Sequence, residues 1–136
     1  MNLPSTTEII EDIEFLDDWE SRYQYIIDLG KALPKLPEEE RAPELKVKGC
    51  QSDVWMITQE NNGVLSFRVD SDAMIVRGLL AMVMAAYNEK KPQEITEFDI
   101  DGYFAAIDLE NHLSPTRGNG LRAIVGKIKA IAAEAA

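Results

Sequence analysis

The chain has 136 residues, 46% of them hydrophobic and 28% charged, a composition typical of a soluble globular protein with a hydrophobic core. Its formal net charge of −10 repels phosphate backbones and argues against nucleic acid as a partner. The single cysteine allows no internal disulfide and fits a reducing compartment. We find neither a secretory signal at the N-terminus nor an apolar run of roughly 20 residues. We therefore expect one domain over residues 1–136, located in the cytoplasm and not attached to a membrane.

The first third of the chain predicts two helices. Ser5 and Glu8 form an S-x-x-E capping box ahead of apolar residues at helical spacing. A second helix is expected to start near Asp17 or Asp18, and Pro34 ends it. The stretch P-K-L-P-E-E-E-R-A-P that follows is too short to separate two domains, so we interpret it as a linker within one domain.

The middle of the chain predicts a small antiparallel sheet. Residues 54–59 and 64–70 have the composition of strands and are joined by an Asn-Gly turn, a strong hairpin signal. The second strand alternates between an apolar and a polar face, and Asp70 falls on the polar face. Residues 45–48 predict a third, short strand that leads into a polar loop.

Helices are expected in the remainder. Residues 72–88 are apolar almost all round apart from Arg77, which is typical of the buried central helix of a domain, and Asp70 or Ser71 can cap it. We expect a short helical segment after Pro92 and a second short helix after that one. The last helix is expected to bury a single stripe of apolar side chains. The order of two helices, a short antiparallel sheet and several helices predicts an α+β fold.

Metal and cofactor sites are not indicated. The chain has one cysteine and one histidine, and it lacks both C-x-x-C and H-E-x-x-H. The carboxylates of Asp72, Asp99 and Asp101 lie near expected helix starts, where capping and the helix dipole explain them. We therefore expect no bound metal and no cofactor.

Cys50 is the residue with the clearest chemical potential. It lies in V-K-G-C-Q-S-D-V-W, where Gly49 permits backbone conformations closed to other residues, and Gln51 and Ser52 do not continue a core pattern. Loops between strands commonly present reactive groups, but a nucleophilic thiol also needs N–H donors or cations nearby, and two neighbouring lysines are candidates. The residues alone leave a packed core thiol and a reactive thiol equally open.

His112 provides one alternative function. A cysteine and a histidine within hydrogen-bond reach form the nucleophilic pair of a thiol hydrolase, and this chain has one residue of each type. Sequence cannot show whether His112 meets Cys50, and a lone histidine in a polar loop is most often solvated or hydrogen-bonded.

The loop V-K-G-C-Q-S-D-V-W resembles the signature loop of the SufE family, the sulfur-accepting partners of cysteine desulfurases. Four further segments are similar to the family pattern and occur in the family's order: W-E-S-R-Y-Q-Y-I-I-D-L-G-K-A-L-P, D-S-D-A-M-I-V-R-G-L-L-A, F-D-I and H-L-S-P-T-R-G-N-G-L. Together they cover nearly the whole chain. The G-C-Q-S form is more similar to SufE than to its paralogue CsdE, and a CsdE-type partner of a different desulfurase remains the alternative.

The resemblance implies a fold akin to the IscU scaffold, with about three antiparallel strands packed with helices. It also implies that a SufS-like desulfurase, which carries pyridoxal phosphate itself, delivers sulfur to Cys50 as a persulfide. Cys50 then passes the sulfur to a SufBCD-like scaffold complex for iron–sulfur cluster assembly. The protein would be an accessory carrier that stimulates the desulfurase rather than a stand-alone enzyme. Because holding a cluster generally takes several thiolates, this chain can carry sulfur but cannot build a cluster alone.

The resemblance singles out several site residues. Cys50 is the expected persulfide carrier, and Arg117 is expected to stabilise the thiolate, the persulfide or the loop, unless it is only a surface residue. Nearby glycines suggest that Arg117 precedes the last helix in a loop. The residues expected to position the loop or meet the partner are Gly49, Gln51, Ser52 and Asp72, with helix capping the alternative for Asp72. Two questions stay open: whether the protein is an adaptor that carries no sulfur, and whether it forms a homodimer.

Overall fold

The computed structural model describes residues 3–135, which form six α-helices and a two-stranded antiparallel sheet. The α-helices are α1 (Thr6–Phe15), α2 (Trp19–Gly30), α3 (Met74–Tyr87), α4 (Pro92–Glu97), α5 (Ile100–Ala106) and α6 (Pro115–Ala135). The strands are β1 (Val54–Asn61) and β2 (Val64–Ser71), and the short 3-10 helices are η1 (Glu38–Glu40), η2 (Pro43–Leu45) and η3 (Glu110–His112). The predicted α+β class is confirmed.

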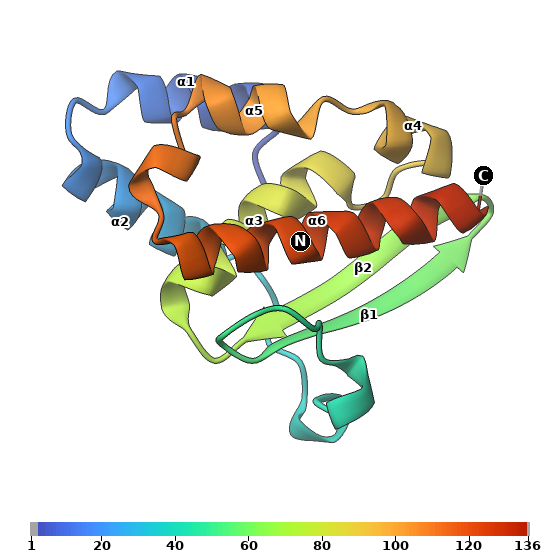
Figure 1. Cartoon of the computed structure of the whole chain (residues 1–136). Helices are drawn as coiled ribbons and strands as arrows, with labels where there is room; N and C mark the ends of the chain where they lie inside the picture. The colour runs from blue at the N-terminus through green and yellow to red at the C-terminus, as the bar shows by residue number, and fades with distance from the viewer. Residues whose placement is uncertain (1–2, 136) are drawn as a thin grey trace.

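The central helix α3 organises the packing. It contacts α1, α2, α6 and β2, and Leu80 to Val83 are fully buried. In Figure 1, α6 runs beside the β1–β2 ribbon, and α1, α5 and α4 lie along the opposite edge of the molecule. Within the described residues, no helix combines the length and the apolar character that crossing a membrane requires.

The helix starts in the first third follow the predicted pattern. The capping box is present, because Ser5 Oγ accepts the backbone N–H of Glu8 at 3.1 Å and Glu8 accepts the backbone N–H of Ser5 at 3.2 Å. Asp18 caps α2, and its carboxylate accepts the backbone N–H of Ser21 at 2.7 Å. Capping by side chains therefore explains where both helices begin.

The backbones of α2 and α3 touch where they cross. A Cβ atom added at Gly78 would lie 2.2 Å from the carbonyl oxygen of Ile26, and one added at Gly30 would lie 2.7 Å from the backbone nitrogen of Gly78. No side chain fits at such distances. The two glycines therefore set how closely α2 approaches the central helix.

The hairpin forms as predicted, but the predicted third strand is wrong. β1 and β2 pair from Val54↔Ser71 to Asn61↔Val64, around a turn whose two residues both have positive φ. Residues 45–48 contribute only an isolated bridge between Lys46 and Trp55. The reason is local: η2 ends at Leu45, and the chain turns away again at residues 48 and 49, so too few residues remain extended.

Strand alternation predicted Asp70 on the polar face of β2, and the structure adds that Asp70 is fully buried there. The segment after α2 covers this end of the strand, and the backbone N–H of Leu36 donates to Asp70 at 2.9 Å. Ser71 donates its backbone N–H at 2.8 Å, and Arg41 and Arg77 each form an ion pair with the carboxylate. Burial alone would raise the pKa of Asp70, but these donors and cations hold the pKa below its usual value.

Arg77 extends the same network to α2. Its guanidinium also donates to the carbonyl oxygens of Gly30 and Leu33, at 3.1 and 2.7 Å. A cation at these carbonyls satisfies acceptors that the end of a helix leaves unpaired. The network of Asp70, Arg41 and Arg77 therefore joins β2, α3, the end of α2 and the segment between η1 and η2.

The predicted cap of α3 is also wrong. The helix begins at Met74, its N-cap residue is Ala73, and no side chain caps it. Ser71 Oγ instead accepts the backbone N–H of Ala73 at 3.3 Å, in the turn before the helix. Asp70 is committed to the two arginines, so it is not free to cap.

We expect the Asp70→Asn substitution to lower the free energy of unfolding by roughly 3–5 kcal/mol, because it leaves two partly buried guanidinium groups without their carboxylate. Asp72→Asn is the matched control, since Asp72 is exposed and should change stability by only about 0.5 kcal/mol or less. Urea denaturation followed by circular dichroism measures both. Equal stability of the two variants would contradict the role given to Asp70.

Candidate functional site

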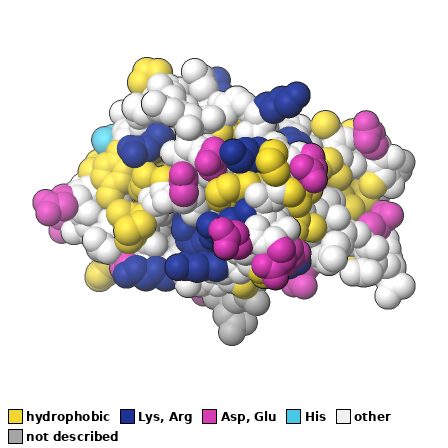
Figure 2. Space-filling model, turned by 90° about the horizontal axis from the view of Figure 1, so that it is seen from below, with side chains coloured by type: hydrophobic (Ala, Val, Ile, Leu, Met, Phe, Trp, Pro, Cys, Tyr) yellow, Lys and Arg dark blue, Asp and Glu magenta, His cyan; other side chains and the backbone are white. Residues whose placement is uncertain are grey.

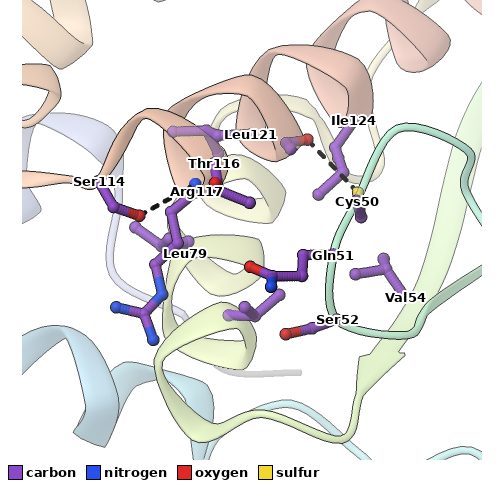
Figure 3. Close-up of a pocket in the computed structure, with 12 residues that line it drawn as sticks. Cys50, Gln51, Ser52, Val54, Leu79, Ser114, Thr116, Arg117, Leu121 and Ile124 are labelled. Carbon is purple, nitrogen blue, oxygen red and sulfur yellow. Dashed lines mark hydrogen bonds between the residues drawn. The ribbon is translucent and has the colours of Figure 1, made fainter.

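Cys50 opens onto a cavity of about 250 Å³ between the loop at residues 48–53, α3 and the start of α6. Figure 3 shows the side chains of Gln51 and Ser52 directed toward the same space. The cavity has an apolar wall and a polar rim. The wall residues are Val54, Val76, Leu79, Leu121 and Ile124, and the rim residues are Gln51, Ser52, Ser114, Thr116 and Arg117.

Gly49 fits the loop closely against α6. Its φ is +92°, a conformation that other residues rarely adopt, and a Cβ atom added there would lie 3.1 Å from Cβ of Ala123. The expectation that Gly49 positions the loop or meets the partner stays a prediction. The loop can lie flat on α6 because both contacting residues are small.

The thiol of Cys50 rests in an environment that favours its protonated form. It is half-buried, and its S–H group points to the carbonyl oxygen of Gly120, with 3.6 Å between sulfur and oxygen. Burial raises the pKa of the Cys50 thiol. The partial negative charge of the carbonyl oxygen also opposes a thiolate. The resting site therefore holds a thiol and not an activated nucleophile.

Lys46, one of the two lysines considered for activation of the thiol, is paired with another group. Lys46 forms an ion pair with Asp53 at 3.3 Å, and its ammonium lies 6.0 Å from the centre of the Trp55 ring. The thiol has a single hydrogen-bond partner among the described residues, and that partner is an acceptor. Within residues 3–135, no three His, Cys, Asp or Glu side chains gather where they could hold a metal ion.

Arg117 lines the cavity, but the predicted loop location is wrong. It lies in the first turn of α6, and its backbone N–H donates to Ser114 Oγ at 3.3 Å. Capping by Ser114 starts the helix three residues before the first glycine, which explains the difference. Its side chain is exposed and forms no ion pair with any described residue, and Figure 3 shows the guanidinium across the cavity from Cys50.

Asp72 and His112 do not join this site. Asp72 is exposed and is not among the cavity residues. His112 stacks on Trp19 with 3.8 Å between ring centres, and its Nδ1 lies 3.0 Å from the carbonyl oxygen of Asp108. His112 therefore forms no pair with Cys50 in this structure, and the arrangement that a thiol hydrolase needs is not present.

Several cavity residues could not be found from the sequence. Gly120 and Ala123 seat the loop, and Val76 and Leu79 of α3 form part of the wall. Gly120 lies within the H-L-S-P-T-R-G-N-G-L segment, so the resemblance indicated its neighbourhood. Val76 and Leu79 lie within the D-S-D-A-M-I-V-R-G-L-L-A segment, but as apolar helix residues they were not distinguished from the core. Ala123 lies outside all of the similar segments.

Comparison with known proteins identifies the family and supports the fold. A family model described as SufE, Fe-S metabolism associated domain, matches residues 7–132. An uncharacterized SufE-like protein of Rhizobium etli is 50% identical over 93% of this chain and 88% of its own, and another of Rhizobium meliloti is 47% identical over 93% and 94%. A hypothetical protein from Thermus thermophilus, solved in solution, shares the fold with a TM-score of 0.77 over 99% of this chain and 98% of its own, at 21% identity.

The match over residues 7–132 places the chain in a class of proteins associated with iron–sulfur metabolism. The chain belongs to the SufE family. The resemblance seen in the sequence is therefore confirmed over nearly the whole chain.

We expect the rate of Cys50 alkylation by iodoacetamide to keep rising with pH beyond about 8.5, where an unperturbed thiol is half ionised. The sign follows from burial, which raises the pKa and so moves thiolate formation to higher pH. The same chain unfolded in urea provides the control. The midpoint of its pH profile of alkylation should lie near the pKa of an unperturbed thiol. A folded-state midpoint at or below that of the unfolded chain would contradict this description of the site.

Proposed function

We propose that the protein accepts sulfur from a cysteine desulfurase onto Cys50 and passes it to an iron–sulfur scaffold. The observation that carries this proposal is the placement of the chain's single thiol on a loop at a cavity, within the most distinctive motif of the family. One thiol suffices to carry sulfur and is too few to hold a cluster.

The transfer is a thiol–persulfide exchange. The Cys50 thiol loses its proton, and the thiolate attacks the outer sulfur of the persulfide on the desulfurase. A bond forms between Cys50 Sγ and that sulfur, while the sulfur–sulfur bond of the donor breaks and its cysteine leaves as a thiolate. The second transfer repeats the exchange with Cys50 as the donor. No net oxidation occurs in either step.

The resting geometry supports a sequence in which docking precedes reaction. The thiol lies against the carbonyl oxygen of Gly120, where ionisation is disfavoured. Moving Cys50 off α6 removes both the burial and the unfavourable carbonyl, so the thiolate fraction rises only when a partner draws the loop out. This arrangement would protect the free thiol from other oxidants.

The docking face proposed for the desulfurase lies beside the cavity. Met74 is 62% exposed and is the first residue of α3, the helix that supplies Val76 and Leu79 to the cavity wall. Exposed apolar side chains next to a reactive group are suited to an interface. On the face shown in Figure 2, Lys and Arg side chains gather beside hydrophobic ones although the net charge of the chain is −10.

The direct test is intact-mass measurement after incubation with a cysteine desulfurase and free cysteine. We expect the wild type to gain the mass of one sulfur atom and Cys50→Ser, which removes only the sulfur nucleophile, to stay folded and gain none. A wild type that gains no mass with any desulfurase overturns the proposal. If Cys50→Ala stimulates the desulfurase as fully as the wild type does, the protein is an adaptor, and a parallel assay with a CsdE-type desulfurase tests the alternative partner.

We expect Met74→Lys to weaken stimulation of the desulfurase, raising the half-saturating concentration by about tenfold or more, as for a residue at the centre of an interface. Phe15→Lys is the matched control. Phe15 is 87% exposed and is the last residue of α1, a helix that supplies no residue to the cavity. Equal effects of the two substitutions, measured by steady-state desulfurase kinetics, would show that this face is not the docking surface.

A further inference from the structure

The loop that carries Cys50 is closed at its base by what we call the loop neck, formed by Lys46, Val47, Asp53 and Val54. The backbone N–H of Val47 donates to the carbonyl oxygen of Val54 at 2.8 Å, and both valines are buried. Lys46 and Asp53 form an ion pair across the neck, but both side chains are more than two-fifths exposed. An exposed pair of this kind contributes little, so the ion pair does not by itself hold the neck in place.

Beyond the neck, the loop is held to the other elements by few contacts. Within the described part of the chain, two hydrogen bonds join residues 48–53 to a helix or a strand. One is the long contact from the Cys50 thiol to Gly120 on α6. The other runs from the hydroxyl of Ser71, which donates to the carbonyl oxygen of Asp53 at 2.7 Å. The short hydrogen bond is at the loop neck and the long one is at the Cys50 thiol. The loop is therefore anchored strongly at its base and weakly at the thiol.

Ser71 is itself held firmly. It is 3% exposed, ends β2 and pairs in register with Val54. Its backbone N–H donates to the buried carboxylate of Asp70 at 2.8 Å, and its hydroxyl oxygen accepts the backbone N–H of Ala73 at 3.3 Å. Asp70, held by its ion pairs with Arg41 and Arg77, therefore helps to fix the backbone of Ser71. A buried hydroxyl with both donor and acceptor roles filled is a precise anchor.

We propose that Ser71 is a positioning residue for sulfur transfer, an inference that rests on the proposed function. Its hydroxyl fixes Asp53, so that residues 48–52 move as one unit when Cys50 leaves α6 and return to the same place afterwards. Gly49 supplies the conformational freedom at one end of this unit, and the bond from Ser71 supplies the fixed point at the other. Ser71 touches neither the sulfur nor the partner and acts through the backbone of the loop.

The substitution Ser71→Ala tests the proposal in the full-length protein. We expect Cys50 to be alkylated by iodoacetamide on the order of fivefold faster, the factor that corresponds to loss of one neutral buried hydrogen bond. We also expect the midpoint of the pH profile of alkylation to fall toward that of a free thiol, because the loosened loop exposes the sulfur. The half-saturating concentration for persulfide loading by the desulfurase should rise by a similar factor, with maximal loading unchanged, since fewer molecules hold the loop in register.

Two further variants separate positioning from general stability. Ser66→Ala removes a hydroxyl from the same strand, away from the loop, and should leave the alkylation rate and its pH profile unchanged. Ser71→Thr keeps the hydroxyl and should restore both, whereas the nearly isosteric Ser71→Val should not. This Thr and Val pair decides the question even if Ser71→Ala fails to fold.

The inference is overturned if Ser71→Ala folds and its alkylation rate and pH profile match those of the wild type, or if the Thr and Val variants behave alike. Alkylation requires no desulfurase, so this outcome is independent of the proposed function. Conversely, a wild type that accepts no sulfur overturns the proposed function and leaves the alkylation result to decide whether Ser71 anchors the loop.

Discussion

Asp70 keeps a negative charge inside the protein by accepting hydrogen bonds from two backbone N–H groups and pairing with two guanidinium groups. Moving a charged group from water into the protein costs free energy. A buried carboxylate is therefore stable only when its hydrogen-bond donors and paired cations are all present. Arg77 reaches from α3 to the end of α2, and Arg41 comes from the segment beyond it, so the carboxylate is satisfied only when four parts of the chain have assembled. The next residue, Ser71, holds the end of the cysteine loop. The placement of the functional loop thus depends on this buried charge.

Under the proposed function, the cysteine loop has to meet two opposing requirements. A sulfur carrier needs a thiolate that reaches a partner, yet a free exposed thiolate is open to oxidation. In the resting structure Cys50 is half-buried against a carbonyl oxygen, which keeps it protonated, and the contacts that hold it there are weak. Strong anchoring at the neck and weak anchoring at the thiol fit a loop that opens on docking and closes again. The small residues Gly49 and Ala123 make the closed position compact.

Local features of the sequence predicted the fold well and the environment of the site less well. The capping box at Ser5, the cap at Asp18 and the Asn-Gly hairpin all formed as expected, because each depends on residues that are neighbours along the chain. The errors lie where distant segments meet. Strand alternation placed Asp70 on the polar face but could not show that the segment after α2 covers it. Residues 45–48 could not extend a strand between η2 and the loop. Arg117 was misplaced because the Ser114 cap outweighs the glycines that follow.

By itself the sequence determined the α+β class and the hairpin, since secondary structure follows from short-range patterns. It also indicated Cys50 as the candidate reactive residue, since a sole cysteine in a distinctive motif is visible without a structure. Only the tertiary structure decided which groups surround that cysteine. Gly120 and Ala123 of α6 contact the loop, and His112 stacks on Trp19 instead of pairing with Cys50. Asp70 pairs with one arginine that precedes it in the sequence and one that follows it. The physical reason is that the protonation and exposure of a thiol depend on atoms within a few ångströms in space, and most of those atoms belong to residues far away along the chain.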